Sequence, residues 1–281
     1  MTRRDLLVGL IAMIAGTLVP VSGRAGNEEP LRIGVAPHTS ARFVLELYQP
    51  LREHLERELN RPVDVMTAPD FTTFVRRALA LDYDIAITTG HQAQVLRVDA
   101  GCLPLRTYAA EFRAVVVVPV ESPATNAAAL ANSRVIGLSP TSLVTQWGQH
   151  WLTDQGVPNI EIRYVSAADS VAQLVLAGEA SAGLFSTANF LSLSPEVRAR
   201  LRFLARSEPM LGRVYMLNPH QASQLDRIQA ALDHFAASPE GKRYFENNSL
   251  LGYRPVRPEE LTALDRYARE VRDYIATQRA P

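Results

Sequence analysis

The sequence predicts a mixed α/β fold arranged as two lobes, because short apolar strands alternate with helices in two successive blocks. One block begins at Leu31 and the other restarts near Asn126. The first block is organised around Tyr83–Ile87, an apolar run without strict alternation, which is typical of a strand covered on both faces. Consecutive units of this kind imply parallel or mixed sheets between layers of helices.

In the first block each expected strand ends in a polar turn that opens a helix. The long helix that follows the first strand carries apolar residues at helical spacing and ends at Asn60. Asp70 is expected to cap the second helix. The expected strands are 31–36, 63–66, 83–87 and 102–108, and the expected helices are 41–59, 70–81 and 91–98.

The second block follows the same pattern after a deep strand at 112–120, the most apolar β-branched run in the chain. After the late strand at 213–217 the pattern predicts helices only. We expect one lobe at 31–115 plus 210–281 and the other at 116–209. The remaining expected strands are 134–138, 161–165 and 182–185, and the remaining expected helices are 126–131, 140–155, 169–177, 221–237, 239–247 and 258–278.

Polar strand-end turns are the candidate ligand site, because ligands of open α/β sheets bind beyond the carboxyl ends of the strands. In the second lobe Ser139 is expected as a helix N-cap with Pro140 at the first helical position, and such a start favours an anion. The alternative is an ordinary βα turn and capping motif. The residues expected to line the site are Pro37, His38, Thr39, Ser40, Thr88, Thr89, Gly90, His91, Ser139, Thr141, Ser142, Thr145 and Ser186.

The first 25 residues are expected to be an export signal. A basic start at Arg3 and Arg4 precedes an apolar run, and small residues at Gly23 and Ala25 suit cleavage. The arginine pair also resembles a twin-arginine signal, and the general and twin-arginine routes stay open. The mature protein is therefore expected to be soluble and periplasmic.

Composition excludes several other classes. The 29 basic and 29 acidic residues balance, so nothing indicates binding to nucleic acid or to an anionic membrane. The six histidines are scattered and match no catalytic or metal-binding motif. We therefore expect no enzyme activity, no cofactor and no metal. The single cysteine, Cys102, cannot form an intramolecular disulfide.

In order, the stretches IGVAPHTSARFVLELYQPLREHLERELNRPV, YDIAITTGHQAQVL, SPTSLVTQWG and LAGEASAGLF resemble the periplasmic phosphate/phosphite/phosphonate-binding proteins of ABC transporters, a branch of the type II solute-binding fold. The resemblance implies two lobes joined by crossover strands near 112–118 and 213–217. It implies a monomer that closes on a small anion and delivers it to an ABC permease.

Family members hold the anion at a Ser-Thr-Ser-Gly helix start, which Thr141 and Ser142 match, while Pro140 and Leu143 replace the first Ser and the Gly. The family's acidic residue before Ala-Gly is Ser181 here, and its loop histidine is missing around 167–170.

The alternative function is sensing. Some proteins that resemble this family pass an oxyanion signal, including arsenite, to a membrane histidine kinase, and Cys102 could then act as a soft thiol ligand. The other interpretation of Cys102 is a small buried hydrophobic residue. Neighbouring genes, for a permease or for a kinase, would separate transport from sensing.

Overall fold

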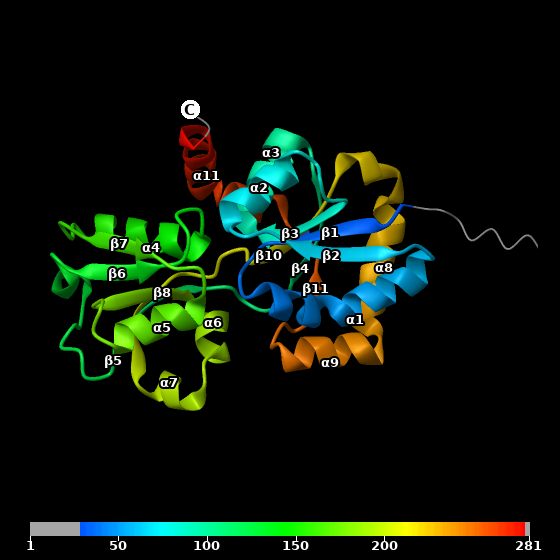
Figure 1. Ribbon diagram of the computed structural model, residues 1–281. Helices are drawn as coiled ribbons and strands as arrows, with labels where there is room; N and C mark the ends of the chain where they lie inside the picture. The colour runs from blue at the N-terminus through cyan, green and yellow to red at the C-terminus, as the bar shows by residue number, and fades with distance from the viewer. Residues whose placement is uncertain (1–28, 279–281) are drawn as a thin grey trace, which may run out of the picture.

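The computed structural model describes residues 29–278 and contains two mixed sheets, each flanked by helices (Figure 1). The expected export signal at 1–25 lies outside the described residues. Between residues 29 and 278 no helix combines the length and the apolar character needed to cross a membrane.

The first sheet has the strand order β11-β4-β10-β3-β1-β2. Strand β1 runs parallel to both β2 and β3, whereas β10 is antiparallel to β3 and β4, and β11 is antiparallel to β4. The carboxyl ends of β1, β3 and β4 therefore share one edge with the start of β10. The bounds are β1 Leu31–Val35, β2 Val63–Thr67, β3 Ile85–Thr89, β4 Leu103–Tyr108, β10 Arg213–Leu217 and β11 Tyr253–Arg254.

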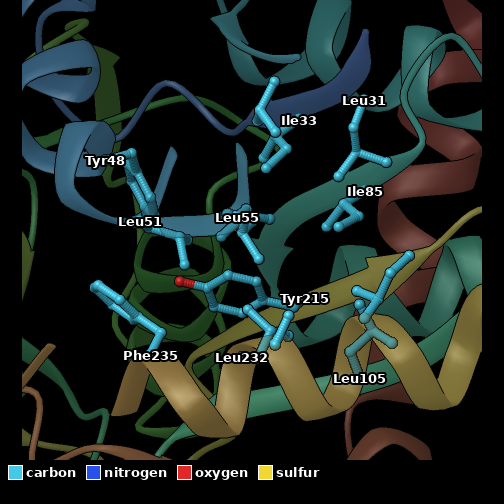
Figure 2. Close-up of a cluster of buried hydrophobic side chains, with 14 of the residues drawn as sticks. Leu31, Ile33, Tyr48, Leu51, Leu55, Ile85, Leu105, Tyr215, Leu232 and Phe235 are labelled. Atoms are coloured by element: carbon cyan, nitrogen blue, oxygen red, sulfur yellow. The ribbon is translucent and has the colours of Figure 1, made fainter. Parts of the chain in front are cut away.

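One face of this sheet packs against α1 (Ala41–Leu59), α8 (Leu225–Ala237) and α9 (Pro239–Asn247). Figure 2 shows the cluster between them, in which Tyr215 of β10 lies among leucines of α1 and Phe235 of α8. Helix α1 buries Tyr48, Leu51, Leu55 and Leu59, which are three or four residues apart and share one helical face.

The other face of the first sheet is covered by α2, α3 and α10, and α11 packs on the outside of α2 and α3. Phe74 of α2 and Leu264 near the C-terminus lie in the same apolar cluster as Met216 of the sheet. These helices are α2 Phe71–Leu79, α3 Gly90–Ala100, α10 Pro258–Thr262 and α11 Asp265–Thr277.

The second sheet has the order β7-β6-β8-β5-β9, with β6 parallel to β7 and β8, and β5 antiparallel to β8 and β9. Helix α4 packs against one face and α5 against the other. Three short elements, η1, α6 and α7, complete this half. The bounds are β5 Ala114–Pro119, η1 Ala127–Leu130, β6 Arg134–Gly137, α4 Leu143–Asp154, β7 Glu161–Tyr164, α5 Ala168–Leu176, β8 Ala182–Ser186, α6 Thr187–Ser192, α7 Pro195–Ala199 and β9 Leu201–Arg206.

Several elements differ from the sequence-based expectation. Strand β9 was missed because arginines interrupt its pattern of apolar residues. β9 is an edge strand, and an edge strand can place such charged side chains in solvent. The short strand β11 makes the expectation of helices only after 217 wrong, although the 3-10 helix η2 (Pro219–Gln224) fits it. The expected helix at 258–278 breaks after Thr262 into α10 and α11.

The chain passes between the two sheets twice, after β4 and after β9. The two connecting segments lie antiparallel, because Phe112 and Met210 form a β-bridge and the Met210 N–H donates to the Phe112 carbonyl at 2.8 Å. Each passage leads directly into an inner strand of the other sheet, β5 or β10. Paired segments of this kind can act as one hinge.

Helix α11 makes an additional contact between the two halves. His150 of α4 bonds Glu270, and its ring stacks on Tyr267 with centroids 5.1 Å apart. Arg266 and Asp154 lie 3.9 Å apart as a weaker ion pair. The C-terminal helix therefore joins the first sheet's helical layer to α4, as Figure 1 shows at the top of the molecule.

Candidate functional site

The predicted site residues follow strand ends of both sheets, at the edges that face each other. His38 follows β1, Thr89 ends β3, and Arg213, which opens β10, pairs with Thr89 in the antiparallel register. From the second sheet, Ser139 follows β6 and Ser186 ends β8. Because β6 and β8 are parallel, their carboxyl ends also share one edge.

The start of α4 differs from the expectation. The N-cap is Ser142, not Ser139, and the helix begins at Leu143. Ser139 instead begins a β-turn in which the Ser142 N–H donates to the Ser139 carbonyl at 2.9 Å. Pro140 is the second residue of this turn, a position that favours proline, as the first helical position also does.

The hydroxyl of Ser142 makes no capping bond. In the first turn of α4, the N–H groups of Leu143, Val144 and Thr145 donate to no acceptor among the described residues. These donors lie at the positive end of the helix dipole, and Ser142 is only 4% exposed. The first turn of α4 is therefore a ready site for an anion.

Two other predicted serines fit the capping interpretation. The Ser40 hydroxyl accepts the Phe43 N–H at 3.3 Å, and the Ser186 hydroxyl accepts the Asn189 N–H at 3.0 Å. The Ser186 hydroxyl also donates to the Asn189 side chain. Unlike Ser142, both hydroxyls are therefore already used within their own helices.

Thr145 positions α4 against the end of β6. Its hydroxyl oxygen accepts the Leu138 N–H at 2.9 Å, and its side chain is fully buried. A Cβ at Gly137 would lie 2.9 Å from the Thr145 side chain, so glycine is needed for this close approach.

A buried set of hydrogen bonds joins the two halves at Thr141. Its carbonyl accepts from His91 Nε2 at 3.0 Å and from Gln92 Nε2 at 3.3 Å. Thr88 orients the Gln92 side chain by donating to its oxygen at 2.6 Å. Sequence analysis missed Gln92. The sequence could have indicated it, because Gln92 follows Thr88 by four residues, about one helical turn, at the start of the expected helix.

Burial lowers the pKa of His91 to about 4, although its bond to the Thr141 carbonyl acts in the opposite direction. The imidazole is therefore neutral at pH 7. Because Nε2 faces a carbonyl it carries the proton, so Nδ1 accepts from the Thr89 hydroxyl, 3.0 Å away. His91 thus links the first sheet to α4 without adding positive charge.

On the first sheet's side the strand-end turn 37–40 places His38 near Arg213. Burial lowers the pKa of His38 well below its ordinary value, and the charge of Arg213 lowers it further. His38 Nδ1 bonds the Ala36 carbonyl at 2.8 Å, while the buried Nε2 atom has no partner among the described residues. Pro37 and Thr39 are half-buried and Ser40 is exposed.

Gly90 lets α3 begin close to the second connecting segment. A Cβ there would lie 2.6 Å from the carbonyl oxygen of Leu211. Leu143, the first residue of α4, packs in the same apolar cluster as Leu211 and Ala36. The start of α4 is therefore held against the first sheet's strand-end turns.

The structure does not bring Cys102 to this site. Cys102 precedes β4, at the opposite edge from the carboxyl ends, and packs in an apolar cluster with Phe74 and Leu96. Burial raises the pKa of its thiol to about 11, which disfavours the thiolate that binds metals and metalloids. Within residues 29–278 no three His, Cys, Asp or Glu side chains gather as a metal site.

A surface hollow also lies elsewhere. It measures about 430 Å³ between α4 and β7 and is lined by mixed side chains, among them Gln149, Leu152, Ile162 and Tyr164. It contains none of the predicted site residues.

Residues 33–261 match a family model described as the periplasmic phosphonate substrate-binding protein of ABC transporters. No curated protein matches the sequence. Similar solved structures include XAC2383 of Xanthomonas citri bound to chloride, with 18% identity and a TM-score of 0.73, covering 87% of this chain and 99% of that one.

Two further structures extend the comparison. PhnD1 of Prochlorococcus marinus in complex with methylphosphonate is 14% identical, covers 86% of this chain and 98% of its own, and has a TM-score of 0.76. A binding protein of an ABC phosphonate transporter from Pseudomonas aeruginosa is 16% identical, covers 90% of this chain and 100% of its own, and has a TM-score of 0.70. At these identities the structures establish the shared fold.

Proposed function

The chain belongs to the phosphonate-binding family of periplasmic substrate-binding proteins of ABC transporters, and from this premise we propose that it captures a small phosphate- or phosphonate-like oxyanion between its two lobes. The captured ligand is delivered to an ABC permease. The protein acts as a monomer, after cleavage of its export signal near Ala25.

The observation that carries the proposal is the uncapped first turn of α4. Its N–H groups and the Ser142 hydroxyl have no protein acceptor among the described residues, although Ser142 is nearly fully buried. Neutral donors of this kind can replace the hydration of an anion without burying a fixed positive charge. A tetrahedral oxyanion supplies the acceptors that these donors require.

The two lobes comprise 31–115 plus 210–281 and 116–209 in this proposal, and the paired segments around Phe112 and Met210 form the hinge. The bonds from His91 and Gln92 to the Thr141 carbonyl belong to the closed state. Opening breaks these bonds and admits the ligand. The burial of Cys102 gives no support to a thiol-dependent arsenite sensor.

Calorimetry on the mature protein tests the proposal with phosphate, phosphite, methylphosphonate and sulfate. In Ser142→Ala we expect the affinity for the preferred anion to fall by about 1.5–3 kcal/mol, the usual contribution of a hydrogen bond to a charged group. Ser186→Ala is the matched control, since its hydroxyl caps α6. That variant should lose about 1 kcal/mol of folding stability and keep its affinity.

Equal affinities of Ser142→Ala and the unmodified protein would place the anion on another element. If none of the four anions binds, the assignment to this ligand class is wrong.

A further inference from the structure

Arg213 lies at the edge of the first sheet that carries the predicted site residues. It is the first residue of β10, directly after the second connecting segment, and its register partner is Thr89. The Arg213 backbone is fixed, because its carbonyl accepts from the Thr107 hydroxyl at 2.7 Å. By strand alternation its side chain lies on the same face as Tyr215, toward α1 and α9.

The guanidinium of Arg213 lies among neutral hydroxyls. Its electrostatic neighbours are Tyr48 of α1, Tyr108 of β4 and Tyr244 of α9. The tyrosines also bond each other: the Tyr108 oxygen lies 2.7 Å from that of Tyr244 and 2.8 Å from that of Tyr215. Burial raises the pKa of Tyr108 and Tyr244 well above the ordinary value, so these hydroxyls carry no negative charge at pH 7.

No carboxylate of residues 29–278 forms an ion pair with Arg213. Two other sheltered arginines are paired, since Arg106 reaches Asp233 at 2.5 Å and Arg254 reaches Glu260 at 2.8 Å. The half-buried Arg76 and Arg202 form no ion pair either, but each donates to a backbone carbonyl. The guanidinium remains charged at every physiological pH, and burial of an unpaired charge is costly. A half-buried arginine of this kind is expected where the counter-charge comes from a ligand.

The anion site at α4 and Arg213 belong to opposite sheets. Between them runs the buried chain of contacts from Thr89 through His91 to the Thr141 carbonyl. This arrangement favours two anchoring points rather than one. The planar fork of an arginine matches a carboxylate by two parallel hydrogen bonds.

We propose that the ligand carries a carboxylate in addition to its oxyanion head group, and that Arg213 binds this carboxylate while the first turn of α4 binds the head group. The inference rests on the proposed function. It narrows the substrate class to carboxylate-bearing phosphonates and excludes ligands with a cationic tail.

The test compares three probes by calorimetry: methylphosphonate, 3-phosphonopropionate and 2-aminoethylphosphonate. They share one head group and differ in a neutral, anionic or cationic tail. The proteins are the unmodified mature chain, Arg213→Met, and Arg206→Met as a control. Arg206 lies exposed at the end of β9, with its guanidinium 4.9 Å from the centre of the Phe203 ring.

In the unmodified protein we expect 3-phosphonopropionate to bind at least about tenfold more tightly than methylphosphonate, and 2-aminoethylphosphonate to bind least tightly. Arg213→Met should weaken the carboxylate probe by about 10–150-fold, the range for a lost hydrogen bond to a charged group. Methylphosphonate should change less than about threefold, and Arg206→Met should resemble the unmodified protein.

Equal losses for all three probes in Arg213→Met would show that Arg213 holds the shared head group, and would overturn the inference. The inference is also overturned if the unmodified protein binds 3-phosphonopropionate no more tightly than methylphosphonate, and this comparison needs no variant. If Arg213→Met does not fold, Arg213→Lys replaces it, since lysine keeps the positive charge but lacks the planar guanidinium. We expect Arg213→Lys to retain part of the preference for 3-phosphonopropionate over methylphosphonate. If methylphosphonate and the other probes all fail to bind, the proposed function itself is wrong.

Discussion

Acidification should destabilise this protein through His91, whose side chain is fully buried and neutral in the folded state. The folded pKa of about 4 lies below the ordinary value of 6.5, so the unfolded chain binds the proton more readily. The contribution of His91 is therefore complete above about pH 6.5 and is lost as the pH falls toward 4. A difference of this size corresponds to about 3 kcal/mol of unfolding free energy.

The assay is denaturant unfolding at several values between pH 7 and pH 4, compared with His91→Gln. Glutamine can still donate to the Thr141 carbonyl but does not titrate. We expect the unmodified protein to lose about 3 kcal/mol more than His91→Gln over this range. His220→Gln, which changes an exposed imidazole, is the control. Parallel pH profiles for the unmodified protein and His91→Gln would refute the reasoning.

Four further predictions concern the site and the hinge. Replacing Thr141 and Ser142 together with alanine should weaken anion binding by about 1.5–3 kcal/mol per lost donor with little change in folding, as calorimetry and thermal unfolding can show. Cys102→Ser should leave anion affinity unchanged. A loss of binding in calorimetry would instead support the alternative function, a thiol-dependent sensor. Gly137→Ala should cost about 1–3 kcal/mol in denaturant unfolding and also weaken binding, since its Cβ would displace Thr145; normal affinity would contradict the placement of the site. Small-angle scattering should show a smaller radius of gyration with ligand than without it, and an unchanged radius would argue against hinge closure.

The local sequence was sufficient to predict most elements of the fold. The run expected at 83–87 overlaps the buried inner strand β3, which lies two residues later at Ile85–Thr89, so the expected turn at Thr88 and Thr89 is the end of the strand. The polar ends of β1 and β3 lie at one edge, because parallel strands place their carboxyl ends together. Periodicity also predicted α1, since burial of one helical face requires apolar residues three or four positions apart. These features depend on neighbours within about twenty residues, so a single sequence contains them.

Other features depended on contacts between distant residues. Pro140 suits both a turn and a helix start. In the structure the Thr141 carbonyl accepts from His91 of α3, 50 residues away, and α4 begins only at Leu143. Likewise, the sequence shows Arg213 as an arginine before an apolar strand. Only the tertiary structure surrounds it with hydroxyls of α1, β4 and α9, and within residues 29–278 no carboxylate pairs with it. A charged side chain acquires its partners by proximity in space, and that proximity arises when segments distant in the sequence pack together.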